Sequence, residues 1–289
     1  MTLPMAVVCA TDLSSRCDRA MDRAAQLARS WNARLVVVHA LESSPAFVAA
    51  RRLHNLPTWR RPADRAQLVA QQLREDLGEQ AVDAAFVVEE AEPTVLVKQA
   101  ADDHRAGLIV TGVARNELLG RQLLGTTVDA LIRQVTTPVL IVRARPHRPY
   151  GRIVAATDFS STSRHALEAV AALFPDADLA LFHAFRPITG GNADSDRIGD
   201  AWRALATQDM ATFLAATILP ESLTARLRTV IEEGDPEPLL SDFVADAHAD
   251  LVVTGARGQN GALDLILGNT AKRLIEGLSC DVLAVRAPP

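Results

Sequence analysis

One glycine-rich segment, TGARGQNGALDLILGNT at residues 254–270, has the residue types and spacing of a ligand-binding loop. It follows the apolar residues 251–253 and precedes a helix-like apolar pattern at residues 271–275. Glycines in such a position let the backbone bend sharply or let a phosphate approach it closely. Amide N–H groups at the start of the following helix would also attract an anion. The segment therefore predicts either a tight connection or a phosphate-binding loop.

Further candidate residues stand where other apolar segments end. Asp158 follows the predicted strand 152–157, Ala184 ends the predicted strand 178–184, and Thr254 and Gly255 lie at the end of the strand before the glycine segment. Parallel sheets bind ligands beyond the carboxyl ends of their strands, so we expect these residues to lie close together. Asp158 could accept a hydrogen bond from a ribose hydroxyl or hold a metal ion through water. Alternatively, it caps the following helix.

The elements that position these residues occur twice in the chain. Five segments of the first half recur in the second: CATDLSS (9–15) as AATDFSS (155–161), VVVHA (36–40) as ALFHA (180–184), LIVTG (108–112) as LVVTG (251–255), GTT (125–127) as GNT (268–270), and VLIVR (139–143) as VLAVR (282–286). The last three pairs share one constant offset. This regularity predicts two copies of one domain, residues 1–145 and 150–289, joined by the short linker RPHRPYG.

Each copy alternates strand-like and helix-like segments. In the second copy, strands are predicted at 152–157, 178–184, 226–231, 251–254 and 282–286, with helices near 160–174, 196–219, 236–248 and 271–278. Near-continuous apolar strands that alternate with helices indicate a parallel sheet covered on both faces. The fold class predicted for each copy is therefore α/β, a doubly wound domain with a five-stranded parallel sheet.

The spacing of the glycine segment, together with the TDFS sequence at 157–160, resembles the universal stress protein family over nearly the whole chain, twice. This resemblance implies flavodoxin-like, Rossmann-like domains that associate through their last strands. It also implies that ATP contacts the residues matching the family's binding positions: Thr157, Asp158, Ala184, Gly255, Arg257, Gly258, Gly268, Asn269 and Thr270. Asn269 departs from the Ser or Thr of that pattern; it can still donate a hydrogen bond but is bulkier.

The first copy departs further from the pattern. Asp12 matches Asp158, and Gly112, Gly125 and Thr126 hold their places, but Arg115 stands where the second copy has Gly258. Arg115 either blocks the site or neutralises phosphate charge directly. Ala91 also replaces the glycine found at position 234. The first copy is therefore predicted to be the weaker nucleotide site.

Composition and missing motifs narrow the functional classes. The 289 residues are 48% apolar with a formal net charge of −5, so two folded domains are expected and nucleic-acid binding is not. No apolar run reaches the roughly 18 residues of a membrane span, and the N-terminal residues do not resemble a signal peptide, so a cytoplasmic location is expected. The three cysteines lack the spacing of a disulfide framework or a zinc site. The chain also lacks a G-x4-G-K-[ST] loop, a G-x-S-x-G elbow and an H-E-x-x-H motif.

Two further patterns are interpreted as structural and not as functional features. His39 and His183 stand at strand ends without a nucleophile beside them, so each is predicted to be a packed, hydrogen-bonded histidine. Residues 50–65 carry five arginines and a tryptophan, and a solvated edge is favoured there over an anion-binding surface.

Three functions remain open. The first is a stress-response regulator that binds ATP, ADP or AMP without strong catalytic activity. The second is a slow ATPase in which Asp158 positions Mg²⁺, and the third is a nucleotide-free or lipid-binding stress scaffold. For assembly, the apolar segments 139–143 and 282–286 are predicted to pair as edge strands within one chain. They would form an intramolecular pseudo-dimer, and a further homodimer is left open.

Overall fold

The computed structural model describes residues 3–41, 64–81, 83–113, 117–118, 121–122, 124–187, 195–256 and 269–287. The chain divides into two compact units, Pro4–Gly112 and Val113–Pro289, the latter together with Met1–Leu3. Within the described ranges, no helix combines the length and the apolar character that crossing a membrane requires.

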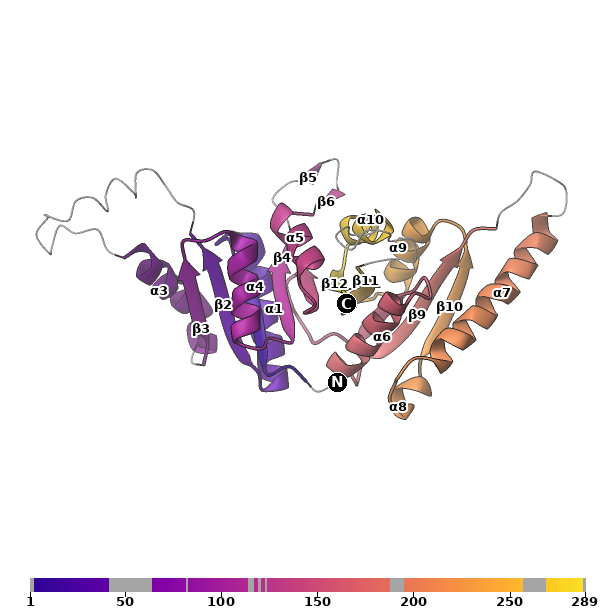
Figure 1. The fold of residues 1–289 in the computed structure, drawn as a ribbon, viewed down its shortest axis with the longest axis horizontal. Coiled ribbons are helices and arrows are strands. Elements are labelled where there is room, and N and C mark those ends of the chain that lie inside the picture. Colours follow the sequence, from indigo (N-terminus) through magenta and orange to yellow (C-terminus); the bar gives the residue numbers. More distant parts are fainter. Residues whose placement is uncertain are drawn as a thin grey trace, which may run out of the picture. The chain divides into compact units, whose positions relative to one another are not determined.

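The unit Pro4–Gly112 contains four parallel strands in the order β4-β1-β2-β3 (Figure 1). Its elements are β1 (Ala6–Ala10), α1 (Ser15–Trp31), β2 (Arg34–Ala40), α3 (Arg65–Leu77), the 3₁₀ turn Gly78–Ala81, β3 (Ala85–Glu89), α4 (Pro93–Asp103) and β4 (Leu108–Gly112). All residues of β1 and β4 are buried. Met21, Ala24 and Ala25, which lie on one face of α1, are buried as well.

The unit that begins at Val113 holds the end of the first copy and all of the second. Its elements are β5 (Glu117–Leu118), β6 (Arg121–Gln122), α5 (Thr126–Gln134), β7 (Val139–Val142), β8 (Arg152–Ala156), α6 (Ser161–Leu173), β9 (Asp178–Phe185), α7 (Ser195–Ala215), α8 (Glu221–Thr224), β10 (Arg228–Glu233), α9 (Pro236–Asp246), β11 (Leu251–Gly255), α10 (Asn269–Gly277) and β12 (Asp281–Val285). Its main sheet has the order β10-β9-β8-β11-β12-β7. Five of these strands are parallel, and β7 joins β12 in antiparallel fashion.

The strand order of the second copy is that of a Rossmann-like sheet. Counted along the copy, β8 to β12 are arranged 3-2-1-4-5, so the order reverses between β8 and β11. Helices α6 and α7 cover one face of this sheet, and α9 and α10 cover the other (Figure 1). The predicted α/β class and doubly wound arrangement are thereby confirmed, and the switch point falls where the second copy's candidate residues begin.

The predicted pairing of the last strands is also confirmed. β7 and β12 pair antiparallel, with Val282 opposite Ile141, Leu283 opposite Leu140 and Ala284 opposite Val139. The paired residues are apolar and buried. Pairing therefore removes two apolar edge strands that would otherwise be exposed to solvent.

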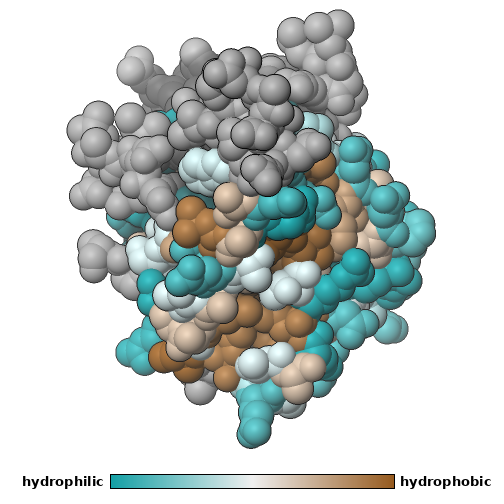
Figure 2. All heavy atoms as spheres, turned by 90° about the vertical axis from the view of Figure 1, so that its right-hand side faces the viewer, coloured by the Kyte–Doolittle hydropathy of each residue, from teal (hydrophilic) through white to brown (hydrophobic). Residues whose placement is uncertain are grey.

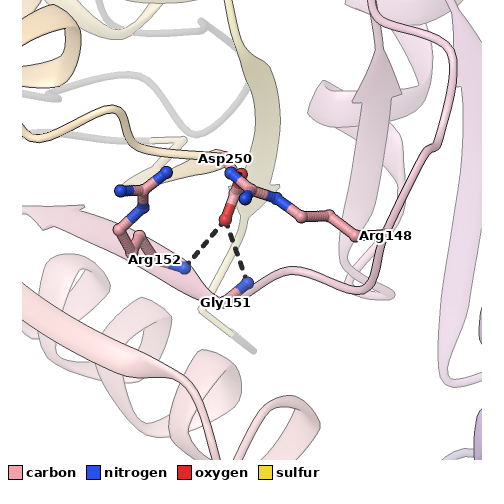
Figure 3. Close-up of polar contacts among 4 residues, drawn as sticks. All are labelled: Arg148, Gly151, Arg152 and Asp250. Carbon is pink, nitrogen blue, oxygen red and sulfur yellow. Dashed lines mark hydrogen bonds and ion pairs between the residues drawn. The ribbon is translucent and has the colours of Figure 1, made fainter.

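The linker between the copies is held against the ends of three strands. The Asp250 carboxylate accepts hydrogen bonds from the backbone N–H groups of Gly151 (3.0 Å) and Arg152 (2.9 Å), and it pairs with the Arg148 guanidinium at 2.9 Å (Figure 3). The Gly151 carbonyl in turn accepts from the N–H of Asp178 at the start of β9. The second half of the linker is therefore part of the folded unit.

Some elements differ from the expectations. The hairpin β5–β6 and the short helix α8 were not predicted, because elements of two to four residues carry no periodicity to recognise. β10 begins two residues later than expected, at Arg228, and α7 ends at Ala215 where a helix to 219 was expected. The ends of helices and strands follow from sequence patterns less exactly than the elements themselves do.

Figure 2 shows the face on the side of α7, where apolar side chains gather in patches between polar ones. Leu205 of α7 is 48% exposed, and Ile218, which follows the helix, is 83% exposed. Buried on the opposite side of α7 are Ala206, Met210 and Phe213. The helix thus packs on the sheet through one buried stripe, whereas Leu205 remains exposed to solvent.

Candidate functional site

The candidate site of the second copy begins at a tight turn after β8. The Thr157 hydroxyl oxygen accepts from the Phe159 N–H (2.9 Å), and an Asp158 carboxylate oxygen accepts from the Ser160 N–H (3.1 Å). Phe159 has a φ of 62°, in the left-handed region that few residues other than glycine adopt. Ser160 then caps α6 by accepting from the Ser163 N–H. Asp158 therefore takes part in the turn that leads into α6, but the residue that caps this helix is Ser160 and not Asp158.

The first copy repeats this turn closely. The Thr11 hydroxyl accepts from the Leu13 N–H at 3.0 Å, and Asp12 accepts from the Ser14 N–H at 2.9 Å. Leu13 has the same φ of 62°. Two sequences that differ at the central residue thus adopt one conformation, which shows that the Thr-Asp-x-Ser pattern and not the ring of Phe159 determines the turn.

The ends of β8 and β11 lie side by side. Thr254 pairs in register with Ala156, so the chain leaves both strands at the same level of the sheet. A side chain at Gly255 would come within 3.0 Å of the Thr162 side chain and 3.1 Å of the Ser163 nitrogen. Gly255 therefore allows β11 to end against the first turn of α6, a packing reason for this glycine that is independent of any ligand.

His183 and His39 are packed side chains, as predicted. In each case Nδ1 lies 2.9 Å from the carbonyl oxygen of the threonine that opens the turn, Thr157 or Thr11. Burial lowers the pKa of His183 below its usual value, despite the opposing effect of that carbonyl. The His183 ring also stacks on Phe159, with 4.1 Å between ring centroids. The histidines therefore support the strand ends instead of projecting toward a substrate.

A charged cluster lies beyond β9 and β10 and was missed by the sequence analysis. Arg186 forms an ion pair with Asp235, and Arg273 of α10 lies 3.9 Å from Asp235 and 3.2 Å from Glu237. Asp235 occupies the N-cap position of α9 without capping it by its side chain. The only sequence signal was that arginines follow both a strand end and the GNT segment. The cluster ties α9 and α10 to the end of β9.

The two copies differ at this edge of the sheet. In the first copy, Glu92 at the matching N-cap accepts from the Val95 N–H at 2.8 Å, as an ordinary cap does. Gly234 has a φ of 143°, which a residue with a side chain rarely adopts, whereas the first copy has Ala91 at this place. The backbone at the end of the third strand therefore cannot be the same in both copies without strain.

The remaining candidate residues are only partly described. Ala184 lies one residue before the end of β9, opposite Glu232. Gly125 is the N-cap of α5 with a φ of −65°, and Thr126 is the first residue of that helix. Thr111 and Gly112 end β4, with the Thr111 hydroxyl donating to the Gly112 carbonyl at 3.3 Å. Asn269 and Thr270 begin α10, but their side chains lie outside the described residues, as do Arg115, Arg257, Gly258 and Gly268 entirely.

The cysteines and acidic side chains show no reactive arrangement in the described ranges. Burial raises the pKa of Cys17 to about 11 and that of Cys280 to about 12, so both thiols stay protonated at neutral pH. Cys9 is fully buried and its pKa is raised further. No group of three or more His, Cys, Asp and Glu side chains could hold a metal ion among the residues the structure describes.

Comparison with known proteins identifies relatives of both copies. A family model described as the universal stress protein family matches residues 5–143 and again residues 149–286. Universal stress protein E of Escherichia coli strain K12 is 38% identical over 58 residues, which are 20% of this chain and 18% of that protein. The match thus spans less than a fifth of this relative's length.

Solved structures share the fold over nearly the whole chain. A universal stress protein from Archaeoglobus fulgidus has a TM-score of 0.66 at 17% identity, covering 97% of this chain and 98% of that chain. A functionally unknown protein from Pseudomonas aeruginosa has a TM-score of 0.64 at 19% identity, covering 98% and 92%. At these identities the likeness concerns the fold alone.

Proposed function

The chain belongs to the universal stress protein family, and from this premise we propose that it is a stress-response regulator that binds ATP or AMP. The nucleotide lies at the carboxyl edge of the second copy's sheet. The register between β8 and β11 carries the proposal, because it places the turn at Asp158 beside Gly255 at the point where the strand order reverses. The helix that follows the glycine segment, α10, begins at Asn269 and directs its first amide groups toward the phosphates.

The second copy is the stronger site in this proposal. Gly234 permits a backbone conformation that Ala91 disfavours, and Arg186 and Arg273 offset the negative charges of Asp235 and Glu237 at the same edge. At the positions that match these two arginines, the first copy has Glu42 and Ala130. An anionic ligand is attracted to the more positive of two otherwise similar edges.

The positions of the His183 and Asp158 side chains fit a protein that binds a nucleotide without strong catalysis. His183 is directed to the Thr157 carbonyl, and Asp158 accepts from the Ser160 N–H in the turn. Neither is placed as a general base with an adjacent nucleophile. Mg²⁺, if bound with the nucleotide, would be held by Asp158 through water and would screen the phosphate charge. The cytoplasm is the compartment we propose, since Cys9, Cys17 and Cys280 are free thiols.

A thermal-shift titration with ATP, AMP and Mg²⁺, beside a phosphate-release assay, tests this function. A ligand at about 100 times its dissociation constant contributes about 2.7 kcal/mol of stability, so a rise of several degrees in Tm is expected. The change Asp158→Ala should remove most of this rise, whereas the matched change Asp12→Ala in the first copy should leave most of it.

Three results would contradict the proposal. Absence of any shift with adenine nucleotides at millimolar concentration rules out the binding function. Equal effects of the two aspartate changes rule out the assignment to the second copy. Sustained phosphate release above about 1 s⁻¹, the low end of ordinary enzyme turnover, rules out a regulator without strong catalysis.

A further inference from the structure

Two arginines occupy matching places at the junction between the copies. Arg143 directly follows β7, and Arg286 directly follows β12, the strand that pairs with β7 in antiparallel fashion. Both belong to the unit that begins at Val113. Because the paired strands run in opposite directions, each arginine leaves its strand beside the other copy.

Each arginine binds a helix of the other copy. The Arg143 guanidinium of the first copy donates to the Ile275 carbonyl of α10, and the Arg286 guanidinium of the second copy donates to the Arg133 carbonyl of α5. Both carbonyls lie in the last turn of their helix, where the final four C=O groups have no partner within the helix. A cation at this end is also favoured by the helix dipole. The two contacts are nearly equivalent, differing by one residue along the helix.

The helices bound in this way are the ones that start at the candidate ligand sites. α10 begins at Asn269 of the GNT segment, and α5 begins at Thr126 of the GTT segment. Each helix has only nine residues, so a contact in its last turn lies about 10 Å from its first residue at 1.5 Å per residue. Fixing the last turn therefore limits where the first amide groups can point.

The Arg143 side of the junction is firmly anchored. Arg143 is 7% exposed, and its backbone N–H donates to the Asp281 carboxylate at 2.7 Å. Asp281 is 1% exposed and also accepts from the Ala144 N–H and the Tyr150 hydroxyl. Burial lowers the pKa of Arg143, while the nearby carboxylates of Asp281 and Glu276 oppose this effect. The arginine is thus held in place by main-chain and side-chain contacts at once.

A second contact joins α10 to the loop of the first copy. The Glu276 carboxylate of α10 accepts from the Leu124 N–H at 3.2 Å, directly before Gly125. Gly125 is the N-cap of α5. The last turn of one ligand-facing helix therefore contacts the segment that leads into the other.

We propose that each copy positions the ligand-facing helix of the other, with Arg143 as the positioning residue for α10 and Arg286 for α5. This inference rests on the proposed function, in which the start of α10 meets the nucleotide phosphates. Its consequence is coupling between the copies. A nucleotide that holds α10 also restrains Arg143, and through β7 and Leu124 it restrains the start of α5 in the first copy.

The test compares Arg143→Gln with its matched control Arg286→Gln. ATP affinity is measured by calorimetry in the Asp12→Ala background, so that the second copy provides the signal. Arg143→Gln should weaken ATP binding about tenfold, a size typical of coupling between sites. Arg286→Gln should change the affinity less than about twofold, a coupling near zero, because this arginine contacts α5 and not α10. Arg143→Lys, which can still donate to one carbonyl, should restore most of the affinity.

Amide hydrogen exchange makes the test independent of nucleotide binding. Without ligand, Arg143→Gln should speed exchange in α10 more than in α5, and Arg286→Gln should show the reverse. A purely structural role at the junction would instead destabilise both helices alike in either variant. Equal effects of the two variants on both helices, or no effect on either helix, overturn the proposal. If the unmodified chain binds no nucleotide while the crossed exchange pattern appears, the proposed function fails and helix positioning stands.

Discussion

At the scale of single residues, the same short pattern builds the same turn in both copies. Thr157 and Thr11 use their hydroxyls to accept an N–H two residues later, and Asp158 and Asp12 do so with their carboxylates. The left-handed conformation of the following residue costs about 1–3 kcal/mol when a side chain is present. Two copies that keep the strained turn, with Phe159 in one and Leu13 in the other, suggest that it serves the strand edge itself.

Asp250 makes stability depend on pH in a defined direction. Burial opposes its ionisation, but hydrogen bonds from the Arg152 and Gly151 N–H groups and from Arg148 hold its pKa below the usual value. A group whose pKa is lowered by folding contributes stability above its unfolded pKa and loses it as the pH falls through the folded value. The contribution should therefore be complete at pH 7 and decline below about pH 4, the ordinary pKa of an aspartate.

Urea unfolding of Asp250→Asn at pH 7 and pH 3 measures this contribution. The variant should unfold at a lower urea concentration than the natural chain at pH 7, and the difference should shrink at pH 3. Asp242→Asn provides the control, since Asp242 is exposed on α9. A difference that stays constant or grows as the pH falls would contradict the assignment of Asp250 as an ionised anchor of the linker.

At the scale of elements, the close approach of β11 to α6 determines which glycine can be replaced. A Cβ at Gly255 would lie 3.0–3.2 Å from atoms of Thr162 and Ser163, two of them in the backbone. Gly255→Ala should therefore lower the free energy of unfolding by about 1–3 kcal/mol, the usual cost of overpacking. At Gly151 the nearest atom to an added Cβ is an Asp250 oxygen at 3.7 Å, an ordinary contact.

Gly151→Ala is accordingly the matched control and should change stability by less than about 0.5 kcal/mol, as surface substitutions do. Denaturant unfolding of both variants gives the comparison. Similar losses for the two substitutions would show that the approach of β11 to α6 is not the reason for Gly255. Its glycine would then have to be explained by a ligand alone.

At the scale of the whole molecule, one buried carboxylate holds the junction between the copies. Asp281 accepts from two backbone N–H groups and from the Tyr150 hydroxyl, at 2.5 Å for the last. Breaking a buried ion pair costs about 3–5 kcal/mol, because the remaining charge is left buried without a partner. Asp281→Ala, which removes the carboxylate itself, should cost about 1–3 kcal/mol through the donors left unsatisfied.

Loosening this junction should also expose the edges of β7 and β12, which are apolar at all their residues except Asp281. Exposed edges of this kind pair with other chains. Light scattering after size-exclusion chromatography should therefore show a larger mean mass for Asp281→Ala than for the natural chain at the same concentration. Tyr150→Phe, which removes one donor and keeps the ring, should show a smaller change. Unchanged mass and stability in Asp281→Ala would mean that strand pairing alone holds the copies together.

The sequence by itself determined the fold class, the duplication and the pairing of the last strands. These depend on features that recur along the chain: apolar runs, turn residues and a constant offset between matching segments. It also predicted that the strands before Asp158 and before the glycine segment end at one edge of the sheet, as the register of β8 and β11 shows. The packing of His39 and His183 followed from the absence of any nucleophile beside them in the sequence.

Only the tertiary structure decided how separate elements meet. The cluster of Arg186, Asp235 and Arg273 and the exchange of arginines between copies join residues that are far apart in the sequence, and no local pattern encodes such contacts. The packing reason for Gly255 was hidden for the same reason, since it depends on the distance between β11 and the first turn of α6. Hydrophobic periodicity specifies which face of an element is buried, whereas side-chain contacts between elements arise only once the sheet has brought those elements together.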